Sequence, residues 1–545
     1  MSRTDTLAVP LGPAAPLVAG TAEEPDAADF ALPPGGLANG QRLRALDRLD
    51  GYLTRKRRNL LGFQATQEMG AGAFDLGRFM QHNINNLGDP FRSGGYKPNT
   101  KVVERAVLDY YADLWHARGP HDPGDPESYW GYVLSMGSTE GNMYALWNAR
   151  DYLSGKPLIQ PPTGTSGPAP EHPGARRPVA FYSEDTHYSF AKAVRVLGVD
   201  TFHAVGSEQY PGECPLPGLP DWPAEVPSSS GPSGRSWDGT GEIDVDALAA
   251  LVEFFAAKGH PIFVSLNLGS TFKGAHDDVR QVCERLLPIF ERHGLIQAQV
   301  THGRDPHTGE PRTDLRRRFW IHVDGALGAG YAPFVRMAAA DPAHGWTPAT
   351  ELPEFDFGLT LPTREFGDLD LVSSIAMSGH KWPGAPWPCG IYMTKVKYQI
   401  APPSQPDYTG APDTTFAGSR NGFSPLILWD HLSRHSHQDQ VDRIRHAQHL
   451  AAYLEHQLRA LELSHNLTLW PARTPGAITV RFRKPSPDLV TKWSLSSQDV
   501  LTTPGDESTR RSYVHVFLMS SVDRTKLDAL LADLAHDPAL RGIAD

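Results

Sequence analysis

Seven short apolar runs, rich in β-branched and aromatic residues, recur between residues 130 and 395, with helical patterns between several of them. Strands joined by helical crossovers pair in parallel, and the helices cover both faces of the sheet. The chain is therefore predicted to contain an α/β domain with a seven-stranded, mostly parallel sheet. The runs are YVLSMG (132–137), VAFYSE (179–184), TFHAV (201–205), PIFVSLNLG (261–269), RFWIHVDGA (318–326), LVSSIAMS (371–378) and GIYMTK (390–395), and the helical patterns cover 141–153, 188–197, 244–258 and 277–293.

The rest of the chain divides by composition and periodicity. Residues 1–37 are rich in alanine, proline and glycine, which predicts a disordered tail. Residues 38–100 are predicted to be an N-terminal helical segment, because leucines at spacings of three and four mark a helix over 40–61. The large domain is predicted over 101–425 and a small α+β domain over 426–545. The leucines are Leu43, Leu46, Leu49 and Leu53, and the small domain has strand patterns at 477–482 and 513–519 and a helical one at 524–535.

Charge, hydropathy and cysteine content exclude several classes of protein. The net charge of −11 over 545 residues argues against a nucleic-acid-binding surface. No stretch approaches 18 apolar residues, so no membrane span is expected. The three cysteines form no CxxC pair, which fits a reducing cytoplasm. Prolines interrupt the mildly apolar stretch at 7–20, which favours a tail over a signal peptide.

Hydroxyl side chains follow the first run, at the start of a predicted helix. Ser138 and Thr139 could hold a phosphate there, because backbone N–H groups and the helix dipole favour an anion. The same residue types are also typical of a helix N-cap. The turn lacks the spacing of a P-loop and of a G-x-S-x-G nucleophile elbow. A phosphate site is therefore one of two interpretations of this turn.

A histidine and an aspartate follow two other runs. His187 could stack on a planar ligand, or it could be a partly buried structural histidine. Asp324 ends an apolar strand, where an unpaired carboxylate is costly to bury, so it should face a cationic partner unless solvent covers it.

One lysine stands in an unusual setting. The chain has only 13 lysines against 38 arginines, and Lys381 lies between two apolar runs, beside a tryptophan and two glycines. Most lysines are solvated at the surface. A lysine desolvated at a strand end has a lowered pKa and can form a Schiff base. Lys381 is therefore a candidate for covalent chemistry.

A phosphate cradle, a stacking histidine, a carboxylate for a pyridinium nitrogen and a Schiff-base lysine are together the parts that hold pyridoxal phosphate. Here the chain resembles the group II pyridoxal-phosphate-dependent amino-acid decarboxylases of type I (aspartate aminotransferase-like) fold, in the histidine/serine decarboxylase branch. It looks most like the bacterial methionine and valine decarboxylases. The matching segments are INNLGDPF (84–91), GSTEGNMYALWNAR (137–150), SEDTHYSFAKA (183–193), LNLGSTFKGAHDD (266–278), IHVDGAL (321–327), SGHKW (378–382), PCGI (388–391), TTFAGSRNG (414–422) and TKWSL (491–495).

The resemblance implies a role for each of these residues. Lys381 would form the Schiff base with the cofactor. Asp324 would pair with the pyridine nitrogen and keep it protonated. His187 would stack on one face of the ring and Ala326 would pack on the other, with Thr271 beside the ring. The phosphate would be held by Ser138, Thr139, Ser378 and His380.

The resemblance also points to two residues outside the strand ends. The segment 399–417 corresponds to a mobile loop that closes over the neighbouring subunit's site, which implies a homodimer. In that loop Tyr408 is the candidate donor of a proton to Cα, although it could also be a packing residue. The family's usual GYP-type segment reads Gly62-Phe63-Gln64 here, so Gln64 is expected to line the substrate pocket.

The predicted function is the α-decarboxylation of an uncharged amino acid, with L-methionine as the best choice and valine, leucine or histidine as alternatives. Oxidative deamination to an aldehyde and an inactive regulatory relative are the other possibilities. Retention of Tyr408 disfavours the first, and Lys381, Asp324 and His187 disfavour the second.

Other polar clusters have simpler interpretations. The histidines between 431 and 449 have no H-E-x-x-H pattern and are expected on a solvated helix face, so no metal site is predicted. Three arginines at 316–318 are expected to form a surface charge cluster. The Gly/Pro-rich stretches 155–178, 206–241 and 301–313 are expected to be surface insertions without an assigned role.

Overall fold

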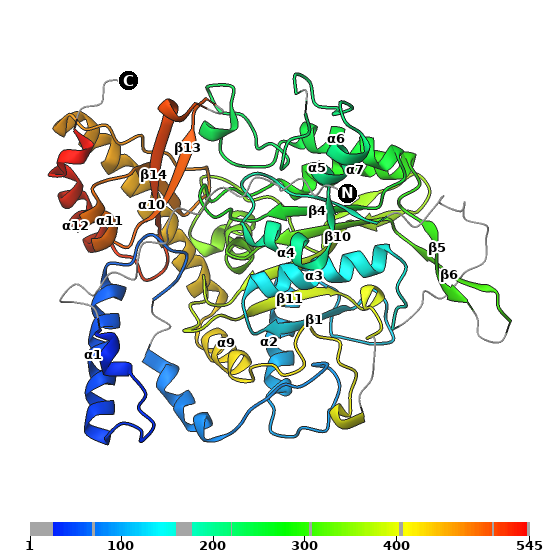
Figure 1. Ribbon diagram of the computed structural model, residues 1–545, viewed down its shortest axis with the longest axis horizontal. Helices are drawn as coiled ribbons and strands as arrows, with labels where there is room; N and C mark the ends of the chain where they lie inside the picture. Colours follow the sequence, from blue (N-terminus) through cyan, green and yellow to red (C-terminus); the bar gives the residue numbers. More distant parts are fainter. Residues whose placement is uncertain are drawn as a thin grey trace.

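Seven strands form one sheet at the centre of the molecule (Figure 1). The computed structural model describes residues 25–67, 71–159, 177–219, 221–304, 308–402, 407–503 and 506–541. The order across the sheet is β1–β11–β10–β7–β4–β2–β3. Strand β11 runs antiparallel to both of its neighbours, and the pairs from β10 to β3 are parallel. The predicted seven-stranded, mostly parallel sheet is confirmed. The strands are β1 (Tyr129–Leu134), β2 (Val179–Phe181), β3 (Asp200–Thr201), β4 (Ile262–Asn267), β7 (Phe319–Asp324), β10 (Val372–Ser378) and β11 (Gly390–Lys395).

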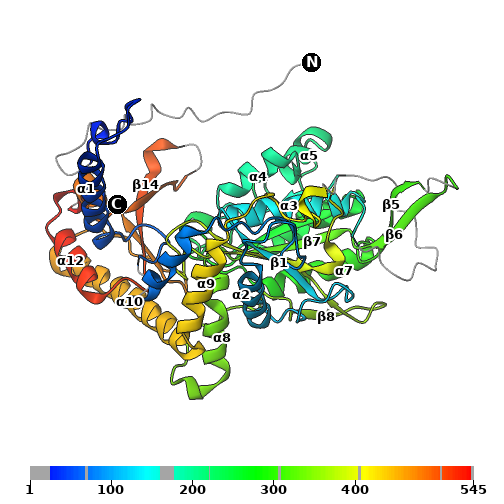
Figure 2. The same ribbon diagram turned by 90° about the horizontal axis from the view of Figure 1, so that it is seen from below.

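Helices cover both faces of this sheet (Figure 2). In β4, Val264 and Leu266 belong to one apolar cluster with helices α6 and α7, whereas Phe263 packs with Phe190 of α4 on the other face. Successive side chains of a strand point to opposite faces. The apolar runs are therefore continuous because each strand is buried on both sides. The surrounding helices are α2 (Lys101–Leu114), α3 (Ser138–Leu153), α4 (Ser189–Leu197), α6 (Val245–Ala257), α7 (Val279–Arg292) and α8 (Ala332–Ala340).

The run at 201–205 is a correction to the sequence analysis, because only its first residue is in a strand. Helix α5 (Phe202–Gln209) begins directly after β3, and the side chain of Thr201 caps it by accepting from the N–H of Ala204. Phe202 and Val205 lie three positions apart and are both buried. Such spacing places them on one face of a helix, and a five-residue apolar run does not by itself distinguish that face from a strand.

The C-terminal part combines helices with a three-stranded antiparallel sheet of order β12–β14–β13. The strands expected at 477–482 and 513–519 and the helix at 524–535 are present. Strand β13 is not predicted, because its sequence SSQDVL is polar and the strand is only partly buried. The elements are α9 (Phe423–Arg434), α10 (His437–His465), α11 (Pro487–Lys492), α12 (Arg524–Ala535), β12 (Thr479–Arg483), β13 (Ser496–Leu501) and β14 (Arg510–Phe517). The domain boundary at 425/426 stays a prediction.

Helix α1 (Asn39–Arg58) stands at the edge of the molecule in both views (Figures 1 and 2). The predicted helix is present, but Ala45 is its only buried residue. Leu43, Leu46 and Leu53 are 45%, 45% and 53% exposed, so the described residues leave the leucine face largely uncovered. The predicted tail lies outside the described residues over 1–24, and a short 3-10 helix (Ala27–Phe30) precedes α1. Among the described residues, no helix combines the length and apolar character needed to cross a membrane.

The three Gly/Pro-rich insertions differ from one another. Most of the first, 155–178, lies outside the described residues. The second, 206–241, buries Trp222 against Phe254 and Phe255 and is therefore partly a core element. The third forms a hairpin of β5 (Ala298–Arg304) and β6 (Pro311–Arg316) that projects from the molecule (Figure 1). A second two-stranded sheet pairs β8 (Thr360–Pro362) with β9 (Asp368–Asp370).

The arginines beside this hairpin are a second correction. Arg316, Arg317 and Arg318 are all buried, so they do not form a surface charge cluster. Arg316 pairs with Asp314 (Nη2–Oδ2, 2.8 Å) and donates to the carbonyl oxygen of Tyr152 (3.0 Å). Burial lowers the pKa of Arg318 to about 10. A buried guanidinium needs such partners, and Tyr152 is too distant in the sequence for the contact to be foreseen.

Candidate active site

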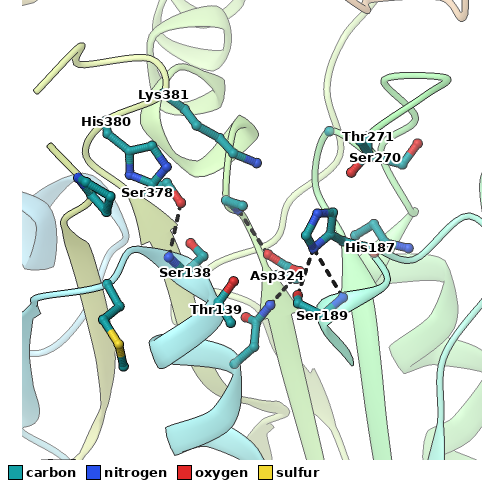
Figure 3. Close-up of a pocket in the computed structure, with 16 residues that line it drawn as sticks. Ser138, Thr139, His187, Ser189, Ser270, Thr271, Asp324, Ser378, His380 and Lys381 are labelled. Carbon is teal, nitrogen blue, oxygen red and sulfur yellow. Dashed lines mark hydrogen bonds between the residues drawn. The ribbon is translucent and has the colours of Figure 1, made fainter. Parts of the chain in front are cut away.

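A cavity of about 240 Å³ lies at the carboxyl ends of β1, β4, β7 and β10. This is the edge at which open parallel sheets bind ligands. In Figure 3 the side chains of Lys381, Asp324 and His187 extend from different elements toward one shared space. The structure thus brings together all the candidates at the strand ends. Those that line the cavity are Ser138, Thr139, His187, Thr271, Asp324, Ala326, Ser378, His380 and Lys381.

Lys381 follows β10 in a turn and extends its amine into the cavity. Its Nζ donates a hydrogen bond to Oε1 of Gln64 (2.7 Å). Burial lowers the pKa of the amine, and the carboxylate of Asp324 opposes this in part. The neutral amine is the nucleophilic form, so a lowered pKa prepares Lys381 to attack a carbonyl carbon.

Asp324 is the last residue of β7, and both of its oxygens accept hydrogen bonds. The side-chain amide of Asn142 donates to Oδ2 (2.7 Å), and the backbone N–H of Ala326 donates to Oδ1 (3.1 Å). Asn142 in turn accepts at Oδ1 from Nε2 of His322 (3.0 Å). The carboxylate is therefore oriented by donors on helix α3 and on its own strand end.

The series of hydrogen bonds continues from His322 to Ser374 and Trp320. Nδ1 of His322 accepts from the hydroxyl of Ser374 (2.8 Å), which accepts from Nε1 of Trp320 (2.9 Å). Burial lowers the pKa of His322 to about 4, so the ring is neutral and has a single N–H, on Nε2. Every group in this chain of hydrogen bonds has a partner, as buried polar groups require.

His187 lies in the turn before α4 with its ring at the cavity. Nδ1 accepts the backbone N–H of Ser189 (3.3 Å) and lies 2.7 Å from its hydroxyl. The proton of the neutral ring is therefore on Nε2. Burial lowers the pKa of His187, the charge of Lys381 lowers it further, and Asp324 opposes both effects. A neutral, planar ring at this position suits stacking on a flat ligand.

The start of α3 forms the opposite side of the cavity. The N–H of Ser138 donates to Oγ of Ser378 (3.1 Å), while the hydroxyl of Ser138 is buried and has no partner among the described residues. Gly137 has a φ of 72°, and a Cβ there would lie 2.5 Å from Cε1 of His380. The backbone N–H groups and the dipole at a helix N-terminus favour an anion, and an unpartnered buried hydroxyl fits a phosphate oxygen.

A second cavity of about 670 Å³ adjoins the first and shares His187, Thr271, His380 and Lys381 with it. Gln64 lines this second cavity and donates from Nε2 to the carbonyl oxygen of Thr271 (3.5 Å). Gln64 therefore contacts two of the shared residues. The other side chains of the lining are aromatic or aliphatic (Phe63, Ala65, Tyr188, Ala191, Phe272, Phe517) and polar (Glu184, Asp185, Thr186, Glu225, Ser496, Gln498), with the backbone of Gly62 between them.

Tyr408 is the one candidate that the structure does not place. Its backbone lies in the 3-10 turn Asp407–Thr409, and its side chain lies outside the part of the chain that the structure describes. The carbonyl oxygen of Thr409 accepts from the N–H of Gly95 (2.8 Å), which joins this turn to the N-terminal segment. The role of Tyr408 stays a prediction.

Asn142 and His322 are not among the residues predicted from the sequence. Asn142 lies one turn inside a helix and His322 in the middle of an apolar strand. Neither is at a strand end, the position at which parallel sheets bind ligands. The signal for His322 is a histidine in an otherwise apolar strand, which requires a buried hydrogen-bond partner.

Three proteins show what the chain is similar to, whereas no family model matches it. It is 76% identical to L-methionine decarboxylase from Streptomyces sp. 590, solved with L-methionine methyl ester in the external aldimine form, with a TM-score of 0.92 over 95% of this chain and 99% of that one. Histidine decarboxylase from Mesorhizobium japonicum is 29% identical over 433 residues, 79% of this chain and 85% of the relative. Serine decarboxylase 1 from Oryza sativa subsp. japonica is 25% identical over 488 residues, 89% and 74% of the two chains.

Proposed function

The chain belongs to the group II pyridoxal-phosphate-dependent amino-acid decarboxylases of type I fold, and from this premise we propose that it decarboxylates L-methionine to its amine and CO2. The observation that carries the choice of methionine is the 76% identity to an L-methionine decarboxylase. The second cavity supports this choice, because aromatic side chains offer an apolar surface beside the amine of Lys381. An apolar surface of this kind suits an uncharged side chain, and the polar side chains of the lining, Glu184, Asp185 and Glu225 among them, leave only part of the cavity apolar.

The residues of the first cavity fit pyridoxal phosphate. When bound, this cofactor supplies the electron-withdrawing ring that takes up the electron pair of the broken Cα–carboxylate bond. Lys381 would hold it covalently and Asp324 would hold its pyridine nitrogen, while His187 and Ala326 would contact the two faces of its ring and Thr271 its edge. The unpartnered hydroxyl of Ser138 supports the phosphate site there. The phosphate would be held by Ser138, Thr139, Ser378 and His380.

Two further residues would act on the substrate. Gln64 contacts the amine of Lys381 and lines the second cavity, so it would hold the amino acid where it meets that amine. Tyr408 would donate the proton that replaces CO2 at Cα. A general acid in a closing loop can do this while the loop excludes water.

The substrate is tested by incubating the protein and pyridoxal phosphate with each of the twenty common amino acids and quantifying amines by mass spectrometry. Methionine should have the highest kcat/KM. Valine, which is one heavy atom smaller than methionine, and leucine, which is branched at Cγ, should be about 10–200-fold poorer, the range expected for a misfit of about one methylene group in an apolar pocket. Acidic and basic amino acids should give less product still, because the aromatic part of the lining would desolvate their charges.

Each alternative has its own outcome in the same experiment. A basic or acidic amino acid as the best substrate would contradict the apolar assignment, and histidine, valine or leucine would correct the substrate alone. Aldehyde and peroxide in stoichiometric yield, with little amine, would indicate oxidative deamination. No product from any amino acid, with no visible absorption that borohydride abolishes, would indicate an inactive relative.

A homodimer is the proposed assembly. The leucine face of α1 is half-exposed in the single chain, and such a face is typically covered by a partner. In sedimentation experiments, the wild type should be a dimer at micromolar concentration. The variant L43Q/L46Q/L53Q should dissociate at least about tenfold more readily, since about 1.4 kcal/mol of lost contact is a factor of ten.

Leu463→Gln is the matched control for the dimer, because Leu463 is 89% exposed on α10 and should not affect assembly. A monomeric wild type, or a triple variant that dimerises as tightly as the wild type, would contradict this interface.

The cytoplasm is the proposed location. Cys214, Cys283 and Cys389 are all free, and burial raises the pKa of Cys389 to about 12. Thiols of this kind persist in a reducing compartment.

A further inference from the structure

The turn that carries Lys381 is held by residues from outside the central sheet. The backbone N–H of Thr66 donates to the carbonyl oxygen of Lys381 (3.2 Å), and Oγ1 of Thr66 donates to the carbonyl oxygen of Trp382 (3.2 Å). Nη2 of Arg443 donates to the same oxygen of Trp382 (3.3 Å). Two backbone carbonyls at the reactive amine are therefore bound by an N-terminal segment and by helix α10.

The N-terminal segment, residues 61–67, is itself fixed to the C-terminal sheet. The N–H of Phe517 on β14 donates to the carbonyl oxygen of Leu61 (2.8 Å). The same segment includes Gln64, which accepts from the amine of Lys381. One short stretch of chain thus binds both the backbone and the amine of Lys381.

Arg443 is partly buried, and no carboxylate pairs with it among the described residues. Its other donors reach Oγ of Ser520 (2.9 Å), Oε1 of Gln440 (3.0 Å) and Nε2 of His431 (3.0 Å). Its guanidinium lies 5.4 Å from the centre of the Trp382 ring. Burial lowers the pKa of Arg443 to about 10, so its charge is desolvated at a cost.

His431 is a correction to the sequence analysis, because it is buried and not on a solvated helix face. Burial lowers its pKa to about 2, with the charges of Arg443, His435 and Arg434 acting in the same direction. The imidazole is neutral and serves as an acceptor for Arg443.

We propose that Arg443 and Thr66 are positioning residues that hold the turn of Lys381, so that its amine stays in line with the first cavity. The inference rests on the proposed function in that Lys381 is taken as the reactive amine. Neither residue lines either cavity, so neither should contact the amino acid. A displacement of about 1 Å at a reacting group can cost about 10²-fold in rate. The proposed effect is therefore on kcat and not on KM.

Three variants test this. Arg443→Met keeps most of the side-chain volume and removes all the donors, Arg443→Lys keeps the charge and one donor site, and Thr66→Val removes only the hydroxyl. Arg443→Met should lower kcat about 10–100-fold with KM within about threefold of wild type. Arg443→Lys and Thr66→Val should fall between it and wild type. Arg445→Met is the matched control, since Arg445 lies on the same helix in a half-exposed pair with Asp442.

A second measurement separates positioning from general destabilisation. The unloaded protein is mixed with pyridoxal phosphate, quenched with borohydride at intervals, and the modified Lys381 peptide is quantified. Attachment should be slower in the Arg443 and Thr66 variants than in Arg445→Met. If Arg443→Met does not fold, Thr66→Val carries the test alone.

The outcomes distinguish a failure of the positioning role from a failure of the proposed decarboxylase function. Unchanged kcat and attachment rate in the variants, or a rise in KM alone, would overturn the positioning role while leaving the decarboxylase intact. A wild-type protein in which borohydride fixes no cofactor on Lys381 would overturn the proposed function itself.

Discussion

Lys381→Ala is expected to lower kcat for decarboxylation by at least about 10³-fold, because it removes the nucleophile that would hold the cofactor covalently. The amine is the nucleophile of the cavity, and its burial-lowered pKa makes the neutral form accessible. Among the described residues, its one side-chain hydrogen bond is the bond to Gln64. The variant should therefore lose chemistry without losing its fold.

The measurement combines activity with a covalent label. Borohydride reduction of the wild type with pyridoxal phosphate should fix the cofactor on the Lys381 peptide, and the variant should show no such label. Lys484→Ala is the control, because Lys484 is an exposed lysine of the C-terminal part. It should behave as the wild type. Labelling of another lysine in Lys381→Ala, with activity retained, would contradict the assignment.

The same variant has a predicted effect on stability. Because the pKa of Lys381 is lowered on folding, the unfolded chain binds a proton that the folded chain does not, in the window just below 10.5. Lys381 therefore makes the unloaded protein more stable as the pH rises through that window. Lys381→Ala should show a smaller rise in melting temperature there, which differential scanning calorimetry would measure.

The fold could be predicted from the sequence wherever burial produces a recognisable run or spacing of apolar residues. Strand β4 reads as an apolar run because both of its faces are covered. The strand prediction is wrong for the residues after Thr201, which form helix α5, because a short apolar run can also be one face of a helix. Strand β13 has no apolar pattern, so only its pairing with β14 reveals it.

The site could be predicted to the extent that its chemistry lies at strand ends. Lys381 and Asp324 can be identified because a charged side chain at the end of a buried strand is costly to desolvate without a partner. Asn142 and Arg443 lie inside helices, where a polar residue is ordinary. Their functions depend on contacts with residues far along the chain, and those contacts have no local signature.

The hydrogen bonds below Asp324 all run in one direction. Trp320 donates to Ser374, Ser374 to His322, His322 to Asn142, and Asn142 to Asp324. Trp320 has a donor only, so the direction cannot be reversed at that end. Asp324 is an acceptor at both oxygens, because Ala326 donates to the other one.

Asp324→Asn places an amide NH2 donor opposite two groups that are themselves donors, the side-chain amide of Asn142 and the N–H of Ala326. The new amide NH2 would face the N–H of Ala326 or the amide of Asn142. If the amide of Asn142 rotated to present its oxygen to the new NH2 group, its own NH2 would face the N–H of His322, and two donors would again meet without an acceptor. A buried donor without an acceptor costs about 1–3 kcal/mol. The substitution is therefore expected to disturb the carboxylate position even though the side chain keeps its size.

We expect Asp324→Asn to lower kcat by about 10²–10³-fold, the loss typical of removing one preorganised electrostatic partner of the reacting system. Borohydride should still fix the cofactor on Lys381, because the amine and the phosphate cradle are unchanged, so the loss should be in the chemical step. Asp499→Asn, an exposed carboxylate paired with Arg510 on the C-terminal sheet, is the control and should leave kcat unaltered. If Asp324→Asn kept kcat within threefold of wild type, Asp324 would not be the partner of the cofactor ring, and the directional chain beneath it would serve the stability of the fold.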